Sequence, residues 1–76
     1  MSKGVFNWTF SDVVKFLKSK GFRHIDTAGS HYHYMAVIGG VTRLVQVPFH
    51  GQTAIKPRTF KSIVAQSGIP MKDWRG

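Results

Sequence analysis

Two histidines, His31 and His33, lie two residues apart in the segment 29–34 and are the side chains of this chain best suited to chemistry. Successive side chains of a β-strand point to opposite faces, so Tyr32 and Tyr34 would share one face and the two histidines the other. Histidine has an ordinary pKa near neutrality and can therefore take up and release a proton under cellular conditions. The segment predicts a proton-transferring group on the open face of a sheet.

The residues beside His31 are predicted to contact the substrate; they are Gly29, Ser30 and His33. A metal site is the other chemistry that closely spaced histidines support, with His31 and His33 as two ligands and His50 as a third. No cysteine is present and the three aspartates are scattered along the chain, so no metal site is predicted.

The chain is strongly basic, with eleven Lys and Arg residues against three acidic residues, a net charge of +8 and an isoelectric point near 10.5. Such an imbalance in a small domain is typical of a protein that binds a polyanion, and nucleic acid is the predicted partner. A membrane is not predicted as a partner, because no apolar run approaches the roughly 18 residues of a spanning helix and no basic amphipathic segment is long enough to anchor the chain. The N-terminus lacks the apolar region of a signal peptide, so we expect a cytoplasmic protein.

Phosphate contacts are expected first from Lys56, Arg58 and Lys61, which cluster where a second helix should begin. The free amides at the start of a helix also favour an anion, which adds to the charge of these side chains. The other basic side chains form the alternative phosphate surface: Lys15, Lys18, Lys20, Arg23 and Arg43.

The length of 76 residues is enough for one small core, because a chain of this size buries only about 60% of the surface that it exposes when unfolded. Hydrophobic residues make up 42% of the sequence, and it contains no linker, repeat or low-complexity segment. Residues 1–76 are therefore predicted to form a single domain, in which residues 1–8 are a lead with no hydrophobic period. The absence of cysteine excludes disulfide bonds and thiolate metal sites and fits a reducing compartment.

A first helix is predicted to begin after Thr9, whose hydroxyl can cap the first turn while Asp12 reaches back to the cap amide. Apolar residues then recur at spacings of three and four, as expected for a helix with one buried face. Gly21 suits the left-handed position after the helix, where Phe22 would pack back on Leu17.

A second helix is predicted from Pro57, because proline is favoured in the first helical turn. Phe60 and Ile63 belong to its buried stripe, and Gly68 ends it as Gly21 ends the first helix. Residues 70–74 are expected to add one more helical turn that docks an indole ring on the core.

Between the helices the hydrophobic period changes to two, which predicts strands at residues 22–27, 30–38 and 41–47. In the first strand, His24 and Asp26 would share a face. Gly39-Gly40 suits a two-residue hairpin turn between the second and third strands. Pro48 cannot donate to a strand ladder and should end the third strand.

A tight turn at Gly39-Gly40 would place Tyr34 opposite Val45 and Tyr32 opposite Val47, which joins two apolar faces into one surface for the helices to cover. Core packing rather than base stacking is therefore predicted for both tyrosines. The other face would be exposed and carries His31, His33, Met35, Leu44 and Gln46. The predicted fold is α+β, with a three-stranded antiparallel sheet and the helices on one face, which is the architecture of small double-stranded-RNA-binding domains.

The motif Gly29-Ser30-His31 lies among the segments 13–21, 45–48, 55–63 and 68–69. Together these residues resemble the HicA family of messenger-RNA-cleaving toxins, over roughly residues 10–69. The resemblance implies a double-stranded-RNA-binding-like fold, a HicB-type antitoxin as protein partner, and His31 as the catalytic residue.

The predicted function is therefore that of a toxin that cleaves mRNA as a metal-independent endoribonuclease, with His31 as its single catalytic histidine, and so inhibits translation and growth. His31 would act as general base or as general acid, and either a 2′-hydroxyl or water could be the attacking group. No cofactor is expected. The alternatives are a non-catalytic module that binds double-stranded RNA and a small adaptor whose basic surface binds an acidic protein.

Overall fold

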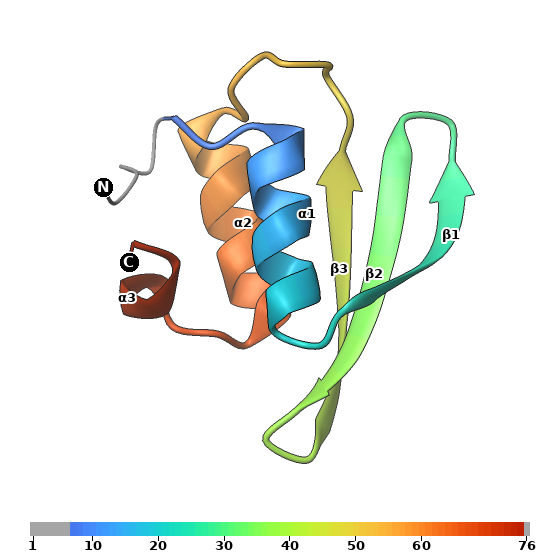
Figure 1. Cartoon of the computed structure of the whole chain (residues 1–76), viewed down its shortest axis with the longest axis vertical. Helices are drawn as coiled ribbons and strands as arrows, with labels where there is room; N and C mark the ends of the chain where they lie inside the picture. The colour runs from blue at the N-terminus through green and yellow to red at the C-terminus, as the bar shows by residue number, and fades with distance from the viewer. Residues whose placement is uncertain (1–6, 76) are drawn as a thin grey trace.

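The computed structural model describes residues 7–75, and the expectations for a lead at residues 1–8 and for the N-terminus fall mostly outside this range. The described chain folds as two helices, α1 and α2, beside a three-stranded sheet, with a short third helix at the end (Figure 1). The elements in order are α1 (Phe10–Ser19), β1 (Arg23–Ala28), β2 (His31–Ile38), β3 (Val41–Pro48), α2 (Pro57–Ser67) and α3 (Met71–Trp74). No helix in this range is long and apolar enough to cross a bilayer.

Local sequence signals set both ends of α1. The Thr9 hydroxyl accepts a hydrogen bond from the Asp12 amide at 3.2 Å, and the Asp12 carboxylate accepts one from the Thr9 amide at 3.0 Å. At the other end Gly21 has a φ of +93°, and the Phe22 amide donates to the Leu17 carbonyl at 3.0 Å. The predicted capping box and left-handed helix ending are both confirmed.

The three strands form an antiparallel sheet in the order β1-β2-β3. Gly39 and Gly40 have φ angles of +60° and +80°, which only glycine adopts easily, and they close the β2–β3 hairpin with two residues. In the resulting register, Tyr34 lies opposite Val45 and Tyr32 opposite Val47. The predicted register is therefore confirmed.

The faces predicted for the first strand are wrong beyond His24. His24 pairs with Tyr34, but the next paired residue is Asp26, opposite His33, so Ile25 forms a β-bulge. One extra residue in a strand reverses the side on which all later side chains lie. Asp26 consequently shares the outer face with His33, while His24 stays on the inner face.

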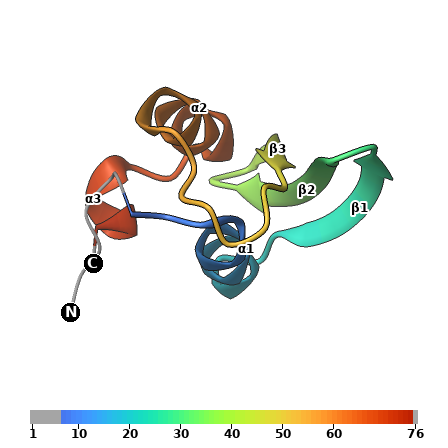
Figure 2. The ribbon, with the colours of Figure 1, turned by 90° about the horizontal axis from the view of Figure 1, so that it is seen from above.

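The core lies between the inner face of the sheet and the helices, and α1 and α2 both pack against β3. In Figure 2, α2 lies beside the outer strand β3, and β1 is the strand farthest from α2. Val13 and Leu17 of α1, Phe60 of α2, and Val45 and Val47 of β3 have no exposed surface. The predicted α+β fold is confirmed.

Trp8 corrects the expectation that residues 1–8 are only a lead. Its side chain is 6% exposed, and its ring lies within 6 Å of the rings of Phe16, Phe60 and Trp74. The Trp8 carbonyl accepts a hydrogen bond from the Ile55 amide at 2.7 Å. The predicted last turn, α3, does dock Trp74 on the core, where the indole is 2% exposed.

Candidate active site

His31 is the first residue of β2, and a tight turn before it fixes its position. Gly29 has a φ of +61°, which lets β1 reverse into β2 within two residues. The Ser30 carbonyl accepts a hydrogen bond from the Phe49 amide at 2.7 Å, and His31 pairs with Pro48. The turn is therefore bound to the end of β3, and His31 is exposed on the outer face.

His31 opens into a pocket of about 330 Å³, here called the His31 pocket, between the sheet and α2. The strands contribute His31, Gln46 and Pro48, the β3–α2 loop contributes His50, and α2 contributes Thr59, Ser62, Ile63 and Gln66. The four helical residues follow the spacing of one helix face. A single face of α2 thus forms one wall of the pocket.

Gln66 fixes α2 against the sheet. Its Oε1 accepts a hydrogen bond from the Gln46 amide at 2.9 Å, and its Nε2 donates to the Ser62 hydroxyl at 3.2 Å. The Gln46 amide lies on the outer edge of β3, where no further strand of the described chain pairs with it. A side chain of α2 thus satisfies an edge-strand donor and holds the helix wall opposite His31.

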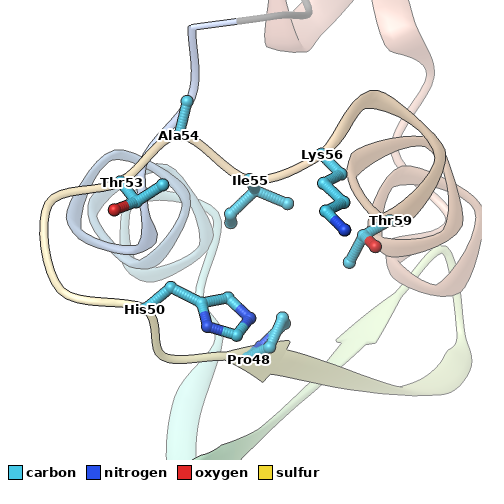
Figure 3. Close-up of a pocket in the computed structure, with 7 residues that line it drawn as sticks. All are labelled: Pro48, His50, Thr53, Ala54, Ile55, Lys56 and Thr59. Atoms are coloured by element: carbon cyan, nitrogen blue, oxygen red, sulfur yellow. The ribbon is translucent and has the colours of Figure 1, made fainter.

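A second pocket of about 520 Å³, here called the Lys56 pocket, continues from the first and shares Pro48, His50 and Thr59 with it. Its other lining residues come from the β3–α2 loop: Thr53, Ala54, Ile55 and Lys56. Figure 3 shows the His50 ring, the Lys56 ammonium and the Thr59 side chain directed toward the same space. His50 therefore stands where the two pockets meet.

A comparison with protein families assigns this chain to a known family. The family described as "HicA toxin of bacterial toxin-antitoxin" matches residues 10–69, which is most of the chain. The chain belongs to the HicA toxin family. No curated protein and no solved structure gives a match. Assignment to a toxin-antitoxin system therefore rests on the family match, and the fold and the pockets of this HicA toxin are read from its own structure.

The basic cluster predicted for this HicA toxin is only partly brought to the pockets. Lys56 precedes α2 and lines the Lys56 pocket. Arg58 and Lys61 are exposed on the first turns of α2 but line neither of the two pockets. They directly precede Thr59 and Ser62, so they flank the helix wall of the site.

His33 does not join His31 in its pocket. Its Nδ1 lies 3.8 Å from the Asp26 carboxylate on the neighbouring strand, a placement that follows from the bulge in β1. Within residues 7–75, no three His, Cys, Asp or Glu side chains gather closely enough to hold a metal ion. The alternative metal site with His50 as a third ligand therefore has no geometric support.

Arg43, one of the alternative phosphate contacts, packs against the end of α2. A Cβ on Gly68, at the end of α2, would lie 2.5 Å from the Arg43 Nε. The guanidinium thus lies over the C-terminal end of a helix, where a cation is favoured. Arg43 and Lys56 therefore lie at opposite ends of α2.

The tyrosines of β2 pack in the core region, as predicted. Tyr34 is 4% exposed, and Tyr32 is half-buried against Phe10, with ring centroids 4.9 Å apart. Burial raises the pKa of Tyr34 above its ordinary 10.0, and the nearby Tyr32 raises it further.

The sequence patterns did not single out Thr59, Ser62 or Gln66, and they indicated His50 as a third metal ligand. A usable signal was present for His50. The predicted register puts His31 opposite Pro48, so the residues just after Pro48 had to lie beside His31. The α2 wall had no such signal, because it depends on how the helix packs against the edge of β3.

Proposed function

We propose that this HicA-family chain is a cytoplasmic endoribonuclease toxin that cleaves mRNA without a metal ion and uses His31 to transfer a proton. The observation that carries the proposal is the placement of His31, exposed at the start of β2 in a pocket whose other wall is a face of α2 with three polar side chains. A proton-transferring side chain must be within reach of its substrate, and this position offers that access.

The proposed reaction uses the 2′-hydroxyl of the RNA as nucleophile. His31, in its neutral form, takes the proton of that hydroxyl while the 2′-oxygen bonds to the adjacent phosphorus. The bond from phosphorus to the 5′-oxygen of the next nucleotide then breaks, leaving a 2′,3′-cyclic phosphate. Lys56, in the adjoining pocket, offsets the negative charge that develops on the phosphate.

Substrate binding extends beyond the pocket in this proposal. Arg58 and Lys61 contact phosphates along the exposed flank of α2, next to the wall formed by Thr59 and Ser62. Contacts of this kind position RNA without reading its sequence. The binding role also includes the Gly29-Ser30 turn and His33, which lie on either side of His31.

Toxins of this family function with an antitoxin. We propose a HicB-type antitoxin that carries acidic residues, because the toxin has a net charge of +8, and that covers the His31 pocket. Complementary charge speeds association and orients the partners, and covering the pocket removes access to RNA.

The test is His31→Ala, with His24→Ala as a matched control on the inner face of the sheet. The His31 variant should lose growth inhibition and at least about 100-fold in cleavage rate, as expected for a proton-transferring histidine. The His24 variant should retain cleavage, and all reactions are run in excess chelator. Circular dichroism melting and RNA-binding assays should show that the His31 variant still folds and binds RNA.

Three outcomes would contradict the proposal. Cleavage by His31→Ala at the wild-type rate would remove the histidine from the reaction. RNA binding by the wild type without cleavage would favour a non-catalytic binding module. Activity lost in chelator and restored by zinc or manganese would show that a metal is required.

A further inference from the structure

We propose that His50 is a second proton-transferring residue, which donates a proton to the leaving 5′-oxygen while His31 takes the proton of the 2′-hydroxyl. This inference rests on the proposed function and replaces the expected single catalytic histidine with a pair. It is derived from the two joined pockets, since His50 lines both of them and His31 lines the first.

The position of His50 is fixed by backbone hydrogen bonds on both sides. Before it, the Phe49 amide donates to the Ser30 carbonyl at 2.7 Å, which ties the loop to the residue preceding His31. After it, the Thr53 amide donates to the His50 carbonyl at 3.2 Å and closes a turn. The backbone on both sides of the imidazole is thereby held in place, and Figure 3 shows the ring directed toward the space that Lys56 also faces.

The lining of the pockets leaves His50 as the group suited to act as the acid. Among the described residues no carboxylate lines either pocket, and the other polar side chains there belong to Gln, Thr and Ser residues and Lys56. Lysine has an ordinary pKa of about 10.4 and stays charged at neutral pH, which suits it to stabilise charge rather than to exchange a proton. Histidine exchanges protons readily near neutrality.

With His31 as base and His50 as acid, the bonds and protons of the cleavage step balance. Neutral His31 gains the proton from the 2′-hydroxyl, the 2′-oxygen bonds to phosphorus, and the bond between phosphorus and the 5′-oxygen breaks. The protonated His50 gives its proton to that oxygen, which leaves as a hydroxyl. His31 ends protonated and His50 neutral, and exchange with water resets both, because both side chains are exposed.

The test compares two short RNAs that contain the bond cut by the wild type, one with the normal 5′-oxygen and one with sulfur in its place. A thiol has a pKa of about 8.5 and leaves as a thiolate without needing an acid. On the normal RNA, His50→Ala should be slower than wild type by about 10² to 10⁴-fold. On the sulfur RNA, it should be within a few fold of wild type, whereas His31→Ala should be impaired on both.

His50→Gln serves as a second variant, since glutamine keeps a hydrogen-bonding side chain but cannot act as the acid. It should behave like His50→Ala on both RNAs, and melting curves should show both variants folded. A wild-type rate in either variant on the normal RNA, or an equal loss on both RNAs, would overturn the role of His50. Failure of the proposed function shows up separately, as a His31→Ala variant that still cleaves.

Discussion

Side chains on the two faces of β2 lie in opposite environments. One face is open to solvent and carries the proposed catalytic residue, and the other packs in the core. His31 is open to solvent at the His31 pocket, while Tyr34, three residues later, is 4% exposed. The alternation of a strand was enough to predict this separation. The partner of His33 was not predictable in the same way, because the bulge at Ile25 carries no signature in the sequence and alone brings Asp26 to the outer face.

The prediction at the residue scale concerns Tyr34→Phe. Burial raises the pKa of Tyr34 in the folded state above the ordinary value of 10.0, so the unfolded chain loses this proton at a lower pH. The contribution of the neutral phenol to stability is thus fully present below about pH 10 and is lost as the pH rises through the folded-state pKa. Between about pH 9 and pH 11, the free energy of unfolding should therefore fall less in the variant than in the wild type.

Denaturant unfolding curves at both pH values measure this difference. At neutral pH the two proteins should be similar, because phenylalanine keeps the aromatic ring that Tyr34, 4% exposed, places in the core. An equal alkaline loss in both proteins would show that other groups account for it.

At the scale of elements, the boundaries were predictable because local chemistry sets them. Thr9 and Asp12 cap α1, Gly21 and Gly68 end the two long helices, and Gly39-Gly40 closes the hairpin. The placement of α2 was not predictable, because it depends on long-range contacts such as the hydrogen bond from the Gln46 amide to Gln66. This placement creates the His31 pocket, so the catalytic candidate was found from the sequence and its surroundings were not.

The prediction at this scale compares Gly68→Ala with Gly21→Ala. Both glycines have positive φ, +72° and +93°, so alanine at either position should cost about 1 to 2 kcal/mol in backbone strain. A Cβ at Gly21 meets nothing within 4 Å, whereas at Gly68 it would lie 2.5 Å from the Arg43 Nε. Gly68→Ala should therefore be the more destabilising in thermal or denaturant unfolding.

Arg43→Ala provides the control for this comparison. In its background the extra cost of Gly68→Ala should disappear, and a double-mutant cycle measures the coupling. Equal costs of the two glycine substitutions in the wild-type background would mean that Arg43 moves aside freely and that only the backbone conformation matters.

At the scale of the whole molecule, the basic side chains are not equally close to the proposed site. Lys56, Arg58 and Lys61 lie where the β3–α2 loop enters α2, at the end of the molecule that holds both pockets. Lys18 lies in the last turn of α1, while Lys72 and Arg75 belong to α3 and its end. Figure 1 shows these two regions at the end of the helices away from the start of α2.

The prediction at this scale replaces Lys56, Arg58 and Lys61 with glutamine and compares this variant with Lys18, Lys72 and Arg75 replaced in the same way. Each triple variant carries three fewer positive charges, so a general effect of net charge is equal in both. Removing one cation that binds an RNA phosphate should reduce the slope of log affinity against log salt concentration by about 0.7 to 0.9. We expect this reduction, and weaker binding of all RNA sequences alike, in the first variant and little change in the second.

If both variants change equally, net charge rather than a phosphate surface beside the pockets attracts the RNA. If only the second changes, the RNA lies along α1 and α3.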